Sequence, residues 1–185
     1  TTNFGHRMTD EQLAWLYAET TSPDSFAFAP GDADTRTCGI GQVSLALDPY
    51  GEVFPCLQVR TSAGNVRQAP IHSLWNQAAV WGEVGNLTLG ELPICSTCEL
   101  RSFCTRCHGL AMMETGDLHA PAMANCREAL VRRRVLIEKG ILPVDYPVPP
   151  HLQKFEFGVQ EESNFIPIGS LEKRTPSHAF DQSIS

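Results

Sequence analysis

The chain has 185 residues, a formal net charge of −7, 14 glycines and 13 prolines, so we expect one loop-rich domain without a large continuous core. The acidic balance argues against a nucleic-acid partner or an anionic membrane surface. No apolar run approaches the roughly 18 residues that span a bilayer, and no signal-peptide pattern opens the chain, so we expect a cytoplasmic protein with no membrane partner.

The first predicted element is a helix from Thr9 to about Thr20. Thr9 and Gln12 have the spacing of a capping box, and apolar residues recur on one helical face at Leu13, Leu16 and Tyr17. No other predicted element obviously covers this face, which suggests that the chain does not act alone. Residues 21–37 contain Pro23, Pro30 and Gly31 and are predicted to form a linker.

A β-hairpin is predicted next. Apolar residues alternate with Ser44 and Ala46 over residues 43–47, the sequence Asp-Pro-Tyr-Gly at 48–51 supplies a turn, and residues 52–55 return toward Cys56. The hairpin would therefore carry one cysteine at each base, Cys38 and Cys56.

Two further helices are predicted. Helical spacing at Ile71, Leu74, Trp75, Ala78 and Trp81, with Ser73 at the start and Gly82 at the end, indicates a core-packing helix. A second helix is predicted from about Cys126 to Lys139 and ends at Gly140, with Arg132, Arg133 and Arg134 on a solvated face rather than at a phosphate site. Beyond Pro143 the proline-containing sequence predicts an arm that is extended or disordered.

Between these helices, residues 95–107 are predicted to form a series of tight turns. Leu100 and Phe103 are the only apolar anchors that the sequence offers there, so we expect little except a bound metal to hold this segment. The cysteine pairs at 95/98 and 104/107 are each separated by two residues. This spacing lets a turn aim both sulfurs at one ion or one cluster, and it is too tight for a comfortable disulfide framework.

Seven cysteines in all lie within fewer than ninety residues, at positions 38, 56, 95, 98, 104, 107 and 126. An odd number cannot pair completely, and in a reducing cytosol such cysteines are more often ligands than bridges. Seven thiolates divide into four and three, which fills one four-ligand site and leaves another one ligand short. Structural zinc could use the same residues, with His108 or His119 as the eighth ligand, although His108 is more readily explained without a ligand role.

The cysteine pattern resembles the SPASM domain of radical S-adenosylmethionine enzymes, which follows the partial barrel in enzymes that mature peptides and proteins. The resemblance covers about residues 38–130 and rests on Cys38-x12-Gly51-x4-Cys56, then Cys95-x2-Cys98-x5-Cys104-x2-Cys107, then Cys126. The stretches LALDPYGEVFPC, IHSLWNQ and CHGLAMMETGDLHAPAMANC also resemble the family. Thr105 and Arg106 are two residues where the family usually has three, and Asp32 stands where some members have an extra cysteine.

The resemblance implies two [4Fe-4S] clusters in a small, irregular α+β fold, with a β-hairpin and short helices organised around them. One cluster would be held by Cys38, Cys56 and Cys107, which we call the hairpin site. The other would be held by the four residues that we call the knuckle site, Cys95, Cys98, Cys104 and Cys126. The hairpin site would keep an open coordination position, for which Asp32 is a candidate ligand, although Asp32 and Asp34 are better explained as loop caps.

The resemblance also predicts the chain's role. Residues 1–37 would be the end of the missing barrel and a linker, residues 38–130 the cluster domain, and residues 131–185 the end of a helix and an extended tail. The chain opens at Thr1 and lacks the Cys-x3-Cys-x2-Cys motif that cleaves S-adenosylmethionine, so we expect part of a larger enzyme that is inactive alone. Its partners would be the barrel, which binds S-adenosylmethionine, and a peptide or protein substrate. A zinc-binding interaction module without redox activity and a standalone ferredoxin-like carrier are the alternatives.

Overall fold

The computed structural model of the chain describes residues 7–21 and 32–153. The chain divides into two units, Thr1–Arg7 with Gly158–Ser185 and Met8–Phe157, and nearly all described residues belong to the second. That unit has the predicted α+β class, with a small antiparallel sheet and several short helices. The predicted linker around Pro23, Pro30 and Gly31 and the end of the predicted tail lie outside the described residues.

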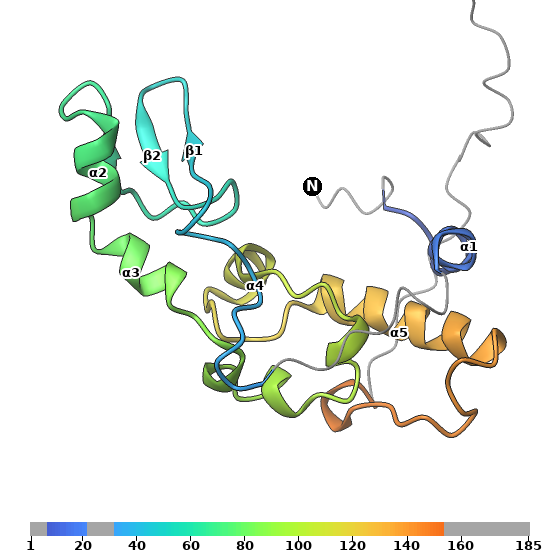
Figure 1. Ribbon diagram of the computed structural model, residues 1–185. Coiled ribbons are helices and arrows are strands. Elements are labelled where there is room, and N and C mark those ends of the chain that lie inside the picture. The colour runs from blue at the N-terminus through green and yellow to red at the C-terminus, as the bar shows by residue number, and fades with distance from the viewer. Residues whose placement is uncertain (1–6, 22–31, 154–185) are drawn as a thin grey trace, which may run out of the picture. The chain divides into compact units, whose positions relative to one another are not determined.

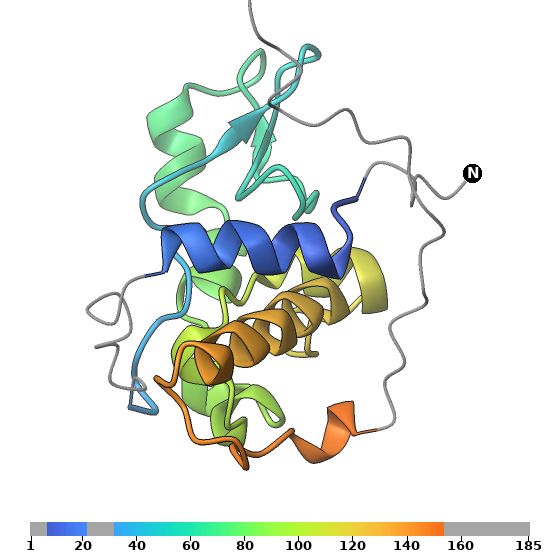
Figure 2. The same ribbon diagram turned by 90° about the vertical axis from the view of Figure 1, so that its right-hand side faces the viewer.

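Helix α1 (Asp10–Thr20) has the predicted capping box, in which Thr9 and Gln12 satisfy each other's backbone N–H groups. Leu13 and Tyr17 are buried against Val131 and Val135 of helix α5 (Met123–Glu138), beside which α1 lies in Figure 2. The expectation that this helical face lacks a partner in the chain was therefore wrong. Sequence patterns show that a face is apolar, but they do not identify the element that covers it.

The predicted hairpin is confirmed, and it carries a third strand. Strands β1 (Ala46–Leu47) and β2 (Glu52–Phe54) pair antiparallel, and β3 (Gly64–Asn65) pairs with the other side of β2 (Figure 1). Gly51 closes the turn with a φ of 89°, a left-handed conformation that favours glycine. Strand β1 is shorter than the predicted 43–47, and β3 was missed because two residues give no periodic signal.

The helix predicted over residues 71–81 is two helices, α2 (Ile71–Gln77) and α3 (Val80–Gly85). Ala78 is extended between them, α2 begins after Pro70 rather than at Ser73, and Gly82 lies inside α3. The break lets the Trp81 indole N–H donate to the carbonyl oxygen of Leu74 at 2.7 Å and brings its ring 4.7 Å from that of Trp75. In one straight helix these two rings would lie on different faces.

The chain segment from Cys95 to Cys104 contains two short 3₁₀ helices, η4 (Cys95–Thr97) and η5 (Arg101–Phe103). Leu100 and Phe103 belong to a hydrophobic cluster with residues of α5 and of the segment 141–152, which includes the short helix η6 (Pro150–Leu152). The other buried members of this cluster are Cys126, Ala129, Leu136 and Leu152. This packing corrects two expectations. The turns have apolar support beyond their own two anchors, and residues 141–152 form part of the core rather than an extended arm.

A helix that was not predicted, α4 (His108–Thr115), follows Cys107 and ends at Gly116. Helix α5 begins at Met123, three residues before the predicted start, and Gly140 follows its end with a φ of 69°. The short 3₁₀ helix η3 (Leu89–Glu91) completes the described elements. Among the described residues, no helix is both long and apolar enough to cross a membrane.

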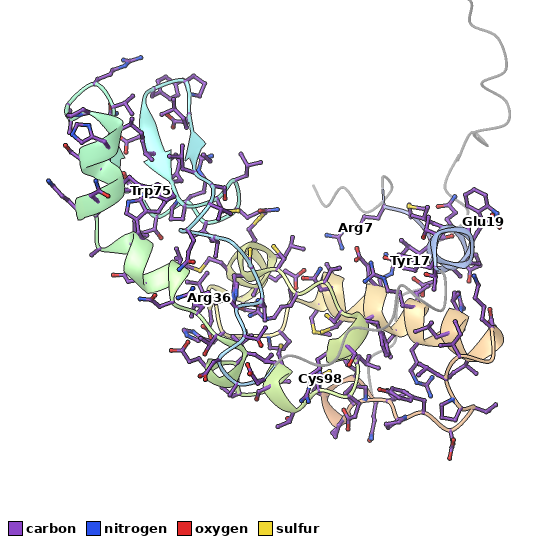
Figure 3. All side chains as sticks on the ribbon, in the orientation of Figure 1. Arg7, Tyr17, Glu19, Arg36, Trp75 and Cys98 are labelled. Atoms are coloured by element: carbon purple, nitrogen blue, oxygen red, sulfur yellow. The ribbon has the colours of Figure 1, made fainter. Side chains whose placement is uncertain are left out.

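The three consecutive arginines of α5 do not form the predicted solvated face. Arg132 donates to the carbonyl oxygen of Phe103 at 2.9 Å, and its guanidinium lies 4.4 Å from the centre of the Tyr17 ring, on the side of α1 that faces α5 (Figure 3). Arg133 donates to the carbonyl oxygen of Tyr146, and Arg134 to that of Asp10. The trio therefore joins α5 to three neighbouring segments.

Candidate metal centres

All seven cysteines are free, and the structure brings four of them together. Cys95 begins η4, Cys98 follows it, Cys104 follows η5, and Cys126 lies in the first turn of α5. The charges of Cys95 and Cys98 affect the titration of both Cys104 and Cys126, which places the four sulfurs in one electrostatic neighbourhood. These are the residues of the predicted knuckle site, where Figure 3 marks Cys98.

Burial dominates the electrostatics of the knuckle site. Together with a smaller effect of the neighbouring cysteines, whose like charges repel, it raises the pKa of Cys104 to about 12 and that of Cys126 to about 12. Burial also raises the pKa of Cys98. At neutral pH these thiols are therefore protonated in the absence of a cation, and a positively charged group that binds them must displace the protons.

The hairpin site is built where three segments meet. The hydroxyl of Thr37, just before Cys38, lies 2.9 Å from Nε2 of His108, just after Cys107. Gly109 is packed so closely against Gln58 that a Cβ atom at Gly109 would stand 2.6 Å from the Cβ of Gln58. Gln58 in turn accepts a hydrogen bond from the Cys56 thiol at 3.1 Å. The flanks of Cys38, Cys56 and Cys107 are thus held together.

The most exposed thiol belongs to the hairpin site and the most buried one to the knuckle site, whereas Cys95, Cys98 and Cys104 are half-buried. Cys38 is exposed, Cys56 and Cys107 are half-buried, and Cys126 of the knuckle site is only 8% exposed. Cys107 caps α4, where its sulfur accepts from the backbone N–H of Leu110 at 3.5 Å. The hairpin site therefore faces solvent on the Cys38 side.

His108 is a buried structural residue of the hairpin site. Its Nδ1 lies 3.1 Å from the carbonyl oxygen of Leu118, and burial holds its pKa below the usual value. Nδ1 also lies 3.2 Å from Nη1 of Arg106, and Nε2 lies within hydrogen-bonding distance of the Thr37 hydroxyl. With both ring nitrogens engaged, His108 is not placed to act as an eighth metal ligand. His119, the other candidate, is half-exposed and contacts Asp117 at 3.1 Å.

Asp32, the predicted candidate for an oxygen ligand, caps a turn. Its carboxylate accepts from the Thr35 hydroxyl at 2.8 Å, and its backbone carbonyl accepts from the Thr35 N–H at 3.1 Å. Asp32 is exposed, which agrees with the interpretation of this aspartate as a loop cap.

Two polar residues that the sequence analysis did not single out connect the sites. Asn125 is 5% exposed, and its side-chain oxygen accepts from the backbone N–H of Cys107 at 2.9 Å. Since Asn125 precedes Cys126, this bond joins a hairpin-site cysteine to a knuckle-site cysteine. Arg106 lies between Cys104 and Cys107 and donates to the carbonyl oxygens of Leu118 and Ala120. Adjacency to a cysteine was the only sequence signal for either residue.

The donor set fits an iron–sulfur cluster at the knuckle site. Four thiols surrounded by apolar side chains are the ligands that such clusters use, whereas a hard cation prefers oxygen. Among residues 7–21 and 32–153, no three His, Cys, Asp or Glu side chains are arranged to hold a metal ion. A cluster is larger than an ion and takes its thiolates at wider spacing, so the fit rests on the shared neighbourhood of the thiols.

Comparisons with known proteins support the resemblance stated from the sequence. Residues 38–108 match the SPASM family, described as an iron-sulfur cluster-binding domain. Over 87 residues the chain is 32% identical to an AdoMet-dependent heme synthase of Methanosarcina barkeri, a stretch of 46% of this chain and 24% of that protein. The chain thus spans about a quarter of the length of this curated relative. No solved structure matches it.

Proposed function

We propose that residues 38–130 are the auxiliary domain of a radical S-adenosylmethionine enzyme, with one [4Fe-4S] cluster at the knuckle site and another at the hairpin site. The observation that carries the proposal is the division of the seven cysteines. Four share one buried electrostatic neighbourhood, and the flanks of the other three are joined by Thr37–His108 and Gln58–Gly109 contacts. The match to an iron–sulfur family over residues 38–108 supports the choice of metal.

The knuckle site would serve as an electron relay. Iron–sulfur clusters supply one-electron chemistry, and burial and hydrogen bonds to the sulfurs set their potential. The chain contributes four thiolates and a dry shell, since Leu100 and Leu136 are each 1% exposed and Leu152 is 3% exposed. This apolar packing reduces the access of water to the sulfurs, although Cys95, Cys98 and Cys104 are half-buried rather than buried.

The hairpin site would position the substrate. Three cysteines leave one coordination position for a ligand that the substrate or another residue supplies. Cys38 is exposed, so a substrate group can approach from that side, and Asp32 lies six residues before it on the same segment. The contacts of His108 with Thr37 and of Gln58 with Cys56 would hold the segments that carry the three cysteines close together.

We propose a peptide or protein as the substrate, in keeping with the resemblance, and S-adenosylmethionine as a cofactor bound by the missing barrel. A porphyrin is the second candidate, because the curated relative is named a heme synthase. Equilibrium binding of an iron porphyrin to the full-length protein separates the two. Saturable binding that competes with the natural reaction favours the porphyrin, and absence of binding favours the peptide.

Metal analysis of the anaerobically purified full-length protein tests the cluster assignment. We expect a brown protein with about eight irons and matching sulfide, whose Mössbauer spectrum shows two cubane clusters, one with a distinct iron site. The alternative of a structural zinc module requires a colourless protein with about two zinc ions. A folded, colourless preparation would therefore overturn the proposal.

A further inference from the structure

Helix α5 begins without a capping side chain of its own. The residue at its N-cap is Ala122, which makes no side-chain hydrogen bond, and the backbone N–H of Cys126 donates to the carbonyl oxygen of Ala122 at 3.0 Å. The backbone N–H groups that precede Cys126 in this first turn have no acceptor within the helix. Such a turn frays readily unless an acceptor comes from another part of the chain.

Helix α4 supplies that acceptor. Glu114 is the second-last residue of α4, and its Oε2 accepts from the backbone N–H of Met123 at 2.5 Å while its Oε1 accepts from that of Ala124 at 3.2 Å. Both oxygens of one carboxylate are used, and negative charge is favourable at a helix N-terminus. Glu114 therefore does from a neighbouring helix what a capping residue usually does from the N-cap position.

The turn that Glu114 caps is the turn that carries Cys126 of the knuckle site. Cys126 lies two residues after Ala124, and the side chain of Asn125 between them accepts from the backbone N–H of Cys107 at 2.9 Å. Cys107 is the N-cap residue of α4. Helix α4 therefore holds the first turn of α5 near both of its own ends, at Cys107 and at Glu114.

We propose that Glu114 is a positioning residue of the knuckle site, which keeps the first turn of α5 formed and so holds Cys126 in place as the fourth thiolate. The inference rests on the proposed function. The other three thiolates come from residues 95–104, so fraying of this one turn leaves the cluster with three protein ligands. Glu114 is exposed, and its replacement removes no buried apolar side chain.

Iron release to a chelator from the anaerobically purified full-length protein tests this proposal. Mössbauer spectroscopy tells the knuckle-site cluster from the hairpin-site cluster, which has a distinct iron site. In Glu114→Ala we expect iron to leave the knuckle site about fivefold faster, the change that loss of a typical helix cap produces in the opening of a turn. Glu114→Gln keeps one acceptor oxygen, and we expect a smaller acceleration. Release from the hairpin site should change less in both variants.

Rescue by a local cap separates this role from a general loss of stability. The backbone of Ala122 is extended, with a φ of −87° and a ψ of 115°, which is the conformation of an N-cap residue. Ala122→Ser places a hydroxyl there that can accept from the N–H of Ala124. By itself this substitution should leave iron release slow. Combined with Glu114→Ala, it should restore slow release from the knuckle site.

The matched control is Glu138→Ala, which removes the same charge from an exposed position at the other end of α5 and should leave release from both sites unchanged. Unaltered release in Glu114→Ala and Glu114→Gln, or equal acceleration at both sites, would overturn the positioning role and leave the proposed function intact. A Glu114→Ala protein that loads only the hairpin-site cluster would be the extreme form of the expected result. Unaltered protein without clusters would overturn the proposed function itself.

Discussion

The knuckle site and the hairpin site place cysteines in different surroundings. The knuckle site has four cysteines within an apolar shell of Leu100, Leu136 and Leu152, where burial raises the pKa of several thiols. The hairpin site has three cysteines held by polar contacts, with Cys38 exposed. The difference between the sites lies in one thiol of each: the proposed four-cysteine site contains the most buried thiol, Cys126, and the proposed three-cysteine site contains the most exposed thiol, Cys38.

Replacing one cysteine in each site should give the largest difference between the two sites, in iron content and in stability. Cys98→Ala should lose about four of eight irons and destabilise residues 95–104, because their remaining support is the apolar shell alone. Cys38→Ala should lose iron from the hairpin site only, with little change in near-ultraviolet circular dichroism, since Cys38 is exposed. Iron and sulfide analysis with electron paramagnetic resonance measures both outcomes. Full iron retention in Cys98→Ala would refute the knuckle site.

In the iron-free protein at pH 8, the thiols of Cys104 and Cys126 should react at least about a hundredfold more slowly than the exposed thiol of Cys38. The thiolate is the nucleophile, and a pKa of about 12 leaves Cys104 and Cys126 almost fully protonated there. Raising the pH from 8 toward 12 should accelerate their alkylation, because each step increases the thiolate fraction. Mass spectrometry after iodoacetamide treatment should find Cys38 modified first. In urea all seven cysteines should react alike, and equal rates in the folded protein would contradict the comparison.

The apolar shell should account for much of the stability around the knuckle site. Leu100→Ala removes a side chain that is 1% exposed and should lower the free energy of unfolding by about 2–5 kcal/mol. Urea denaturation monitored by circular dichroism gives this value. The matched control is Leu57→Ala near the hairpin site, where the leucine is 76% exposed and the expected change is within about 0.5 kcal/mol. Equal effects of the two substitutions would contradict the different packing of the sites.

Loss of a polar contact at the hairpin site should lower stability by less than loss of an apolar side chain at the knuckle site. Thr37→Val keeps the shape of the side chain but leaves Nε2 of His108 buried without its partner, at a cost of about 1–3 kcal/mol. We expect iron of the hairpin site to be lost to a chelator faster, with the knuckle site unaffected. Thr35→Val, which removes only an exposed contact to Asp32, is the control. Equal release rates in Thr37→Val and the unaltered protein would show that this bond does not support the site.

Local patterns predicted part of the fold well. The capping box at Thr9 and Gln12 and the turn at Gly51 depend on residues within a few positions, and both are confirmed. The prediction of one helix over residues 71–81 was wrong because the Trp81 ring packs against the Trp75 ring, a contact that sequence periodicity does not reveal. The prediction that Arg132 lies on a solvated face was wrong for a similar reason, since its hydrogen-bond acceptor, the carbonyl of Phe103, is twenty-nine residues away in the chain.

The candidate sites show the same limit. Cysteine spacing and the family resemblance predicted the two ligand sets, which stay a prediction; the structure places the knuckle cysteines in one electrostatic neighbourhood and joins the flanks of the hairpin cysteines. No spacing pattern in the sequence identifies Asn125 and Arg106, the two residues that connect the sites. Their contribution depends on hydrogen bonds to backbone atoms twelve to eighteen residues away in the chain.

The sequence by itself determined the chemistry: which residues are thiols, how closely each pair is spaced, and which family pattern the spacing resembles. The tertiary structure decided the environment of each thiol, including the burial of Cys104 and Cys126, the exposure of Cys38 and the contact of α1 with α5. The physical reason is that ligand spacing is a short-range property of the chain. Burial, electrostatic interaction and hydrogen bonding depend on segments that only folding brings together.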